Sequence, residues 1–297
     1  MESIAMCALC ENVDKLQLSH IIPKFVFRYL KKDSFTGRMR NVSNPNKAVQ
    51  DGDKMYLLCG KCEKLFSQRE TLFSNKFFQK FKADGFNGLS YDGNWLNYFI
   101  TSVNWRTLYL DLKGFVENND KENGVDKKDL KLLIKTEKIM RDYLLDFRSD
   151  LSFIENHIFF FDDVKSIDSS LRISSPHRLI QGSAFGYTVL TKNPKGIYVV
   201  ANLTGIIIVT IIKKATKEKW RNSYVKQESG KIKVPQQVRS PIFSELFYLQ
   251  EQREKYLNQM SEKQKQQIID KVVVSGESYK KSGSYKRFLK DQEIEFK

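Results

Sequence analysis

Four cysteines, placed as two Cys-x-x-Cys pairs, have the clearest capacity for chemistry in this 297-residue sequence. Cys7 pairs with Cys10 and Cys59 with Cys62, and the two-residue gap lets both sulfur atoms of a pair reach one ion about 2.3 Å away. The spacing predicts a tetrahedral, structural Zn²⁺ site. Because four thiolates leave no open coordination position, we expect the ion to stabilise the fold without taking part in a reaction. A redox role needs a β-α-β setting around one pair, which this sequence lacks.

The segment between the two pairs contains Leu18-Ser19-His20-Ile21-Ile22-Pro23, and Glu63 directly follows the last cysteine. The order is a Cys-x-x-Cys pair, a strand ending in His-Ile-Ile-Pro, a loop, and Leu-Leu-Cys-x-x-Cys-Glu opening a helix. Over roughly residues 5–82 this order resembles the zinc-stapled subgroup of the HNH nuclease family, whose fold is the ββα-metal fold. The resemblance implies an N-terminal module that hydrolyses phosphodiester bonds. After residue 82 we find no resemblance to a characterised domain.

The resemblance also implies roles for individual side chains. His20 matches the histidine that takes a proton from the attacking water, a task that suits a neutral imidazole near pH 7. Glu63 matches the last motif position, on the first turn of a helix, where it would hold a catalytic Mg²⁺ or Mn²⁺. Glu70 lies on the same helical face and would either assist in holding that cation or form an ordinary ion pair.

Two parts of the sequence depart from the family pattern. The family commonly has a metal-binding Asp, Glu or His before the histidine, whereas this sequence has Ser19, a poor ligand. The cation would therefore need another carboxylate. Asp53 lies near the place of the family's middle asparagine, and Asn44 and Asn46 are alternatives for that orienting role. These departures leave open a module that binds nucleic acid without cutting it.

Each histidine also has an ordinary structural interpretation. His20 could be satisfied by a backbone carbonyl or replace a cysteine as a zinc ligand, but its place between the two cysteine pairs favours catalysis. His157 and His177 lie in or near strand-like sequence without acidic or cysteine companions that would suggest a site. We therefore expect these two histidines to pack and to form hydrogen bonds in the interior.

Basic residues outnumber acidic ones by 50 to 35, and the formal net charge of +15 favours a polyanionic partner. A basic helix face is predicted directly after Pro23, so a nucleic acid lying along it would present phosphates to His20. The alternative is a solvated helix face. The predicted nucleic-acid contacts are Lys24, Arg28, Lys31, Lys32, Lys61 and Lys64. Nine basic and two acidic residues between 213 and 239, and a tail mixing Lys with Tyr and Phe, could extend this surface.

The pattern of apolar residues divides the chain into an HNH-like module (1–82), a linker (83–94) and a second domain with a basic tail (95–297). In the module we predict a helix after Pro23, a polar loop over 37–53 and a helix over 63–82. In the second domain we predict helices over 95–115, 127–146, 242–259 and 261–272, strands over 157–161, 178–190, 196–201 and 205–213, and a tail from 276 that is mobile in isolation. Turn residues at 193–196 and 202–205 predict hairpins, and the apolar run at 206–212 predicts a central strand.

Together these features predict an α+β protein with an N-terminal zinc-bound ββα-metal module, a helical segment and a mixed α/β domain containing an antiparallel sheet. The predicted function is that of a metal-dependent endonuclease acting on nucleic acid, DNA rather than RNA. Family resemblance implies an effector of bacterial or phage defence or of a mobile element. The alternative is a zinc-dependent nucleic-acid-binding or regulatory protein without catalysis.

A third interpretation is a nuclease that stays silent until the second domain meets a protein partner or a small-molecule activator. The sequence contains no phosphate-binding loop or dinucleotide motif that would identify such an activator. Apolar runs are too short to span a bilayer and the first residues do not resemble a secretory signal, so we expect a cytoplasmic protein. The sequence leaves the oligomeric state open.

Overall fold

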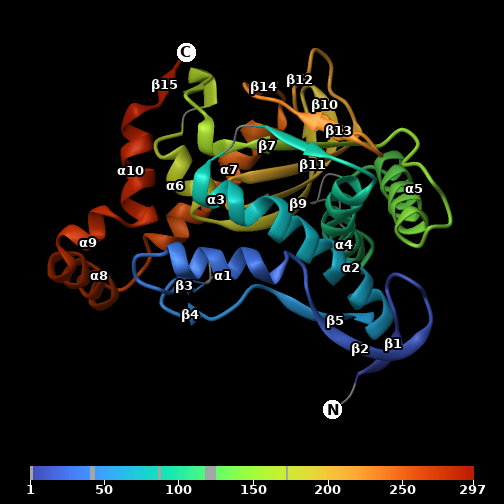
Figure 1. Ribbon diagram of the computed structural model, residues 1–297, viewed down its shortest axis with the longest axis horizontal. Coiled ribbons are helices and arrows are strands. Elements are labelled where there is room, and N and C mark those ends of the chain that lie inside the picture. The colour runs from blue at the N-terminus through green and yellow to red at the C-terminus, as the bar shows by residue number, and fades with distance from the viewer. Residues whose placement is uncertain (1–2, 41–43, 86–87, 118–124, 172) are drawn as a thin grey trace.

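A central antiparallel sheet with helices on both faces organises the computed structural model, which describes residues 3–40, 44–85, 88–117, 125–171 and 173–297 (Figure 1). The sheet has the strand order β7-β11-β10-β9. Its strands are β7 (Glu155–Phe160), β9 (Ala184–Lys192), β10 (Lys195–Leu203) and β11 (Ile206–Lys213). The protein is therefore of the α+β class, as its sequence predicts.

Two hairpins connect the last three strands of this sheet. β9 pairs with β10, and β10 pairs with β11, in antiparallel register. In the second hairpin Thr204 and Gly205 both have positive φ, 56° and 96°, which is the conformation of a tight two-residue turn between twisted strands. β11 lies between β7 and β10, and its apolar residues are buried on both faces. The predicted hairpins and central strand are confirmed.

Helix α4 (Trp95–Glu117) covers one face of the sheet and is buried on all sides along its first 14 residues, from Trp95 to Leu108. Apolar residues occur on all its sides, with buried polar residues such as Asn104 and Arg106 among them, because the sheet contacts one side and the N-terminal part of the chain contacts another. Helix α5 (Lys127–Leu144) packs beside α4. Helices α6 (Pro176–Gln181) and α7 (Ile242–Leu257) pack against the opposite face.

The N-terminal part is a small antiparallel sheet followed directly by a helix. The sheet has the order β1-β2-β5, and helix α2 begins at the residue after β5. Its elements are β1 (Ile4–Met6), β2 (Val13–His20), α1 (Lys24–Asp33), β3 (Met39–Arg40), β4 (Ala48–Val49), β5 (Lys54–Cys59) and α2 (Gly60–Phe73). The single helix predicted over 63–82 is interrupted by a π-helical turn, Ser74–Phe78, and continues as α3 (Gln79–Asp84).

One expectation for the second part of the chain is wrong. The segment 178–181 belongs to α6 and not to a strand, which begins only at Ala184. The tail, which we expect to be mobile in isolation, is docked in the full chain, where the Asp291 carboxylate accepts hydrogen bonds from the backbone N–H groups of His177 and Arg178 at the start of α6. The remaining elements are β6 (Leu89–Tyr91), β8 (Ser166–Ile167), β12 (Lys219–Arg221), β13 (Gly230–Ile232), β14 (Gln237–Arg239), α8 (Glu262–Ser275), α9 (Glu277–Lys280), α10 (Gly283–Glu293), β15 (Glu295–Phe296) and two short 3₁₀ turns, Phe161–Asp163 and Ser169–Leu171.

The hydrophobic core crosses the predicted domain boundary. One cluster joins Leu58 and Phe66 to Trp105 of α4, and a second joins Phe25 of α1 to Ile208 of the central sheet. The boundaries at 82 and 95 stay predictions, but the two parts share their packing. Within the described parts of the chain, no helix combines the length and apolar character needed to cross a bilayer.

Candidate functional site

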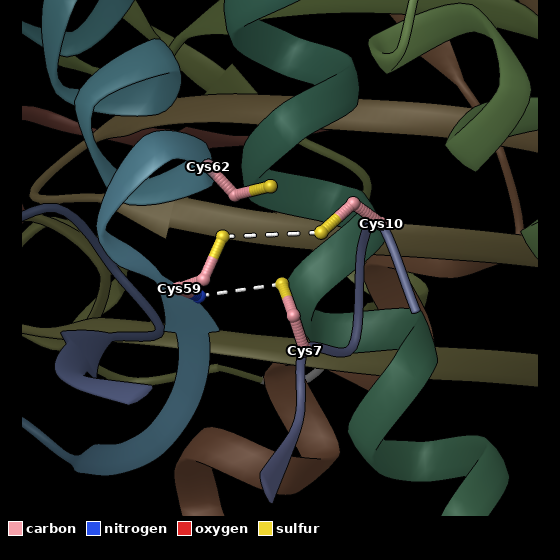
Figure 2. A group of neighbouring side chains, drawn as sticks. All are labelled: Cys7, Cys10, Cys59 and Cys62. Atoms are coloured by element: carbon pink, nitrogen blue, oxygen red, sulfur yellow. Dashed lines mark hydrogen bonds between the residues drawn. The ribbon is translucent and has the colours of Figure 1, made fainter. Parts of the chain in front are cut away.

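The four cysteines meet at the junction of the small sheet and α2 (Figure 2). Cys7 follows β1, Cys10 lies in the turn before β2, Cys59 ends β5, and Cys62 lies in the first turn of α2. Their sulfur atoms all lie within 4.8 Å of one another. The Sγ atoms of Cys10 and Cys59 are 3.8 Å apart, close to the edge of about 3.8 Å that a tetrahedron with 2.3 Å Zn–S bonds would have.

The environment of Cys7 favours a thiolate. A hydrogen bond from the Cys62 thiol lowers the pKa of Cys7 to about 4, and backbone N–H groups oppose the effect of burial. One of these groups, the N–H of Cys59 at the end of β5, lies 3.3 Å from the Cys7 Sγ. Burial raises the pKa of Cys10, and the contact with Cys7 raises the pKa of Cys62. The start of α2 adds its positive dipole end. A group of four sulfur ligands, three of them buried and that of Cys10 partly exposed, fits a structural Zn²⁺, as the sequence predicts.

His20, the last residue of β2, is paired with an aspartate that sequence reasoning did not select. Its Nε2 lies 3.0 Å from Oδ2 of Asp51, and the same oxygen accepts a hydrogen bond from Lys54 Nζ at 2.6 Å. The side chains of His20 and Asp51 are 15% and 24% exposed. Burial raises the pKa of Asp51, but hydrogen bonds from Lys54 and His20 outweigh it and lower the pKa to about 2.

This arrangement fixes which nitrogen of the ring carries the proton when the imidazole is neutral. An ionised Asp51 can only accept a hydrogen bond, so Nε2 of His20 must donate to it. The lone pair is then on Nδ1, for which the described residues provide no hydrogen-bond partner. His20 is therefore oriented by a carboxylate and keeps one nitrogen available to accept a proton from water.

The structure does not bring Glu63 to His20. Its Oε2 accepts a 2.6 Å hydrogen bond from the hydroxyl of Ser19, which is fully buried. Neighbouring residues of a strand project to opposite faces, so Ser19 faces α2 while the imidazole of His20 faces away from it. Among the described residues no hydrogen bond or ion pair joins the two side chains, and a joint action of His20 and Glu63 on one phosphate stays a prediction.

Glu70 is held by a buried arginine of α4. Its Oε1 lies 2.7 Å from Nη2 of Arg106, and Nη1 of the same guanidinium donates to the backbone oxygen of His20 at 2.7 Å. Arg106 is 1% exposed. Of the two roles expected for Glu70, the structure shows the ion pair. With Glu63 bonded to Ser19 and Glu70 to a guanidinium, these side chains as arranged do not fit a Mg²⁺ or Mn²⁺ site, which needs several free oxygen ligands.

None of the three loop residues considered for the orienting role bonds to His20 within the described chain. Asp53 is exposed, and its backbone oxygen accepts from the N–H of Ile21 at 3.3 Å. The side chain of Asn44 accepts from the backbone of Asn46, and that of Asn46 accepts from the N–H of Ser261. Asp51 could have been found only with the register of β2 and β5. Lys54 lies opposite His20 in this register, so the residues just before Lys54, including Asp51, lie next to the imidazole ring.

The two other histidines are interior residues, as predicted. His157 is 2% exposed, packs against the ring of Trp220 and bonds to Ser223, although it also has an acidic companion, Glu155, that was not expected. His177 is equally buried, and its Nε2 lies 3.1 Å from the backbone oxygen of Val164.

The predicted basic residues lie on the surface beside this site. Lys31 donates to Gln50. The exposed members are Lys24, Arg28, Lys32, Lys61 and Lys64, and none of these forms an ion pair with an acidic residue that the structure describes. The second basic cluster does not continue this surface, because Figure 1 shows β12, β13 and β14 at the end of the molecule opposite β2 and β5.

No family model, curated protein or solved structure matches this chain. The functional proposal therefore depends on the residues and their geometry.

Proposed function

We propose that this chain hydrolyses phosphodiester bonds in nucleic acid, DNA in preference to RNA, and that its N-terminal part acts as a zinc-stapled module of HNH type. One observation carries the proposal: a partly exposed histidine is oriented by an ionised aspartate at 3.0 Å and keeps its second nitrogen available. The cluster of four cysteines and the order of two antiparallel strands and a helix support it.

The residues around His20 support three tasks in such a reaction. Nδ1 takes a proton from the attacking water, and Asp51 stabilises the imidazolium that forms. Lys54, which lies beside Asp51, offers a positive charge to the scissile phosphate. The basic residues of α1 bind phosphates of the nucleic acid and so align its backbone. A divalent cation would act as a Lewis acid on the phosphate. Because Glu63 is bonded to Ser19 and Glu70 to Arg106, these two carboxylates as arranged do not bind a cation, and none of the three tasks depends on one.

The test is cleavage of supercoiled plasmid, single-stranded DNA and RNA by the purified chain with Mg²⁺, Mn²⁺ or Ni²⁺. We expect cutting by the wild type and a loss of at least about 100-fold in His20→Ala, because the general base is removed. His157→Gln is the matched control and should cut whenever it folds, since His157 lies in the interior of the second domain. Equal cutting by His20→Ala would contradict the proposal.

A second candidate is a nucleic-acid-binding or regulatory protein without catalysis. The observation that favours it is the engagement of both predicted cation ligands, Glu63 by Ser19 and Glu70 by Arg106. It predicts salt-dependent DNA binding that persists in His20→Ala, together with no cutting under any cation. A role in phage defence or in a mobile element, and activation by a partner, stay predictions from the sequence.

A further inference from the structure

A large cavity lies between the N-terminal part and the C-terminal helices. Its volume is about 850 Å³, and its walls come from α1, β3, β4, β5, α4, β9, α6, α7, α9 and α10. Asp51 and Lys54, which contact each other beside His20, are among the lining residues. Figure 1 shows α8, α9 and α10 beside β3 and β4 at one end of the molecule. This volume is in the range of small-molecule sites in proteins.

One wall of the cavity carries a buried amide without hydrogen bonds. Gln250 of α7 is 1% exposed, and neither its Oε1 nor its Nε2 has a partner among the residues that the structure describes. Buried amides are nearly always paired, because an unpaired donor or acceptor loses its hydrogen bonds to water and gains none in return. A second lining residue, Arg287, is 9% exposed, and its Nε has no described partner either.

The rest of the wall combines apolar and aromatic side chains with charges of both signs, because Asp51, Asp53 and Asp111 line it as well as several basic residues. Phe185 and Tyr187 stack on each other along β9, with ring centroids 5.3 Å apart. Arg38 and Arg40 also line the cavity, and within the described chain neither forms an ion pair with a carboxylate. Nη1 and Nη2 of Arg40 donate to the backbone oxygen of Pro45 and to Oε1 of Gln264, so a phosphate would have to share or replace these contacts. Burial and the charge of Arg38 lower the pKa of Arg40, so the two guanidinium groups are close enough to repel. An anion between them would relieve this repulsion.

We propose that this cavity binds a nucleoside phosphate, with Gln250 reading the edge of the base and Arg38 and Arg40 taking the phosphate. An amide offers one donor and one acceptor side by side, and the edge of a nucleobase offers the complementary pair in the same plane. The aromatic residues of β9 supply a face on which a base can stack. Asp51 and Lys54, which the proposed nuclease uses, also line this cavity, but binding of the nucleotide requires no proton transfer by His20.

Binding of a base to Gln250 requires a local rearrangement of the cavity wall. Both amide atoms of Gln250 are closed to water, so a base reaches them only by displacing neighbouring side chains of the wall. Met260 and Phe288 also line the cavity, and an unbranched methionine adapts readily to such a change. Two sources can supply the same chemistry: a free mononucleotide, or a nucleotide within a single strand.

The test uses the full chain and measures binding by calorimetry and by the thermal unfolding midpoint. The probes are AMP, GMP, CMP and UMP, the corresponding nucleosides, and single-stranded oligonucleotides of each base. Gln250→Met removes the unpaired amide while keeping the volume, so the ligand-free variant should unfold at the same temperature as the wild type or higher. We expect its Kd for the preferred nucleotide to rise at least about tenfold. Gln252→Met, on the same helix but outside the cavity wall, should bind as the wild type does.

Each outcome decides the proposal. Binding of a mononucleotide that is lost in Gln250→Met supports a free nucleotide as the ligand, and binding of oligonucleotides alone with the same loss supports a strand. Failure of every nucleotide and oligonucleotide to bind the wild type would overturn the proposal. Equal affinity of Gln250→Met and the wild type would also overturn it. Because cutting is scored separately in His20→Ala, failure here is distinguishable from failure of the proposed nuclease.

Discussion

The contact between His20 and Asp51 determines what the imidazole can do. A carboxylate whose pKa is lowered to about 2 stays ionised at every pH at which the protein would work, so it holds the same ring nitrogen as a donor throughout. Because that nitrogen is engaged, the lone pair of the neutral ring is on the other nitrogen, which has no hydrogen-bond partner among the described residues. The carboxylate also offsets the positive charge that the ring acquires when it takes a proton. Asp51 is therefore a positioning residue for His20.

The variant Asp51→Asn tests this role. We expect the single-turnover cleavage rate to fall about 100-fold, because an amide can orient the ring but cannot stabilise the imidazolium. Affinity for DNA should stay within about threefold of the wild type, since the basic residues that contact phosphate are unchanged. Asp14→Asn is the matched control, because Asp14 lies on the same sheet and is exposed. A rate in Asp51→Asn equal to that of the control would contradict the assignment.

Site residues could be identified from the sequence where their spacing along the chain is typical of a shared ligand. The four cysteines are such residues, because two short gaps bring each pair to one ion. Asp51 is not, since it reaches His20 only through the antiparallel register of β2 and β5. The separation of Glu63 from His20 also depends on three-dimensional structure, because it follows from which strand face α2 covers.

Among the elements, α4 connects the two parts of the molecule through a charged side chain. Arg106 projects from α4 toward α2 and the end of β2. Its guanidinium donates hydrogen bonds to Glu70 and to the backbone oxygen of His20. The ring of Phe66 lies 5.4 Å from the guanidinium carbon. The arginine thus fixes the backbone position from which the imidazole of His20 projects.

Removing Arg106 should destabilise the protein strongly. We expect Arg106→Met to lower the free energy of unfolding by about 3 kcal/mol, because Glu70 is left partly buried without its partner. Arg148→Met, which breaks an exposed pair with Asp150, should cost less than about 1 kcal/mol. Urea denaturation measures both. In the double variant Arg106→Met and Glu70→Met the loss should be smaller than the sum of the single losses, and additive losses would contradict coupling between the two residues.

The buried imidazole of His177, in α6 where α10 packs, predicts that the free energy of unfolding depends on pH. Burial, and then the charge of Lys290, lowers the pKa of His177 from 6.5 to about 4. The unfolded chain therefore binds a proton that the folded chain excludes, so stability is full above pH 6.5 and falls as the pH drops to about 4. The contribution of this residue is about 3 kcal/mol.

The variant His177→Gln should lose that part of the pH dependence, because glutamine does not titrate and can still donate to the carbonyl of Val164. Urea unfolding of wild type and variant between pH 7 and pH 4 measures the difference. An identical slope in the two proteins over this range would show that His177 does not titrate as its burial implies.

Elements with long periodic patterns were predictable, and elements defined by contacts were not. The apolar runs of α4, β10 and β11 predict their type and nearly their ends. The short helix α6 was missed because its six residues are apolar enough to pass for the start of β9. The docking of the tail was missed because it depends on a cap supplied by Asp291 to a helix more than 100 residues earlier.

For the whole molecule, the four-cysteine cluster and the central sheet form one packed body. Cys59, Cys62 and Leu58 belong to the same hydrophobic cluster as Trp105 of α4 and Ile197 of β10. Loss of the metal would therefore loosen the support of β2 and of the imidazole at its end, and would extend into the second domain. The composition predicts a basic surface and the pattern of apolar residues predicts the α+β class, whereas this continuity across residues 83–94 could not be read from local patterns.

The most direct measurement takes zinc content and DNA cleavage from the same preparations of the wild type and His20→Ala. The account predicts one zinc per chain in both proteins and cleavage by the wild type alone. Cleavage by fully zinc-loaded His20→Ala at the wild-type rate would contradict it, as would a wild type that holds its zinc, binds DNA and cuts under none of the cations tested.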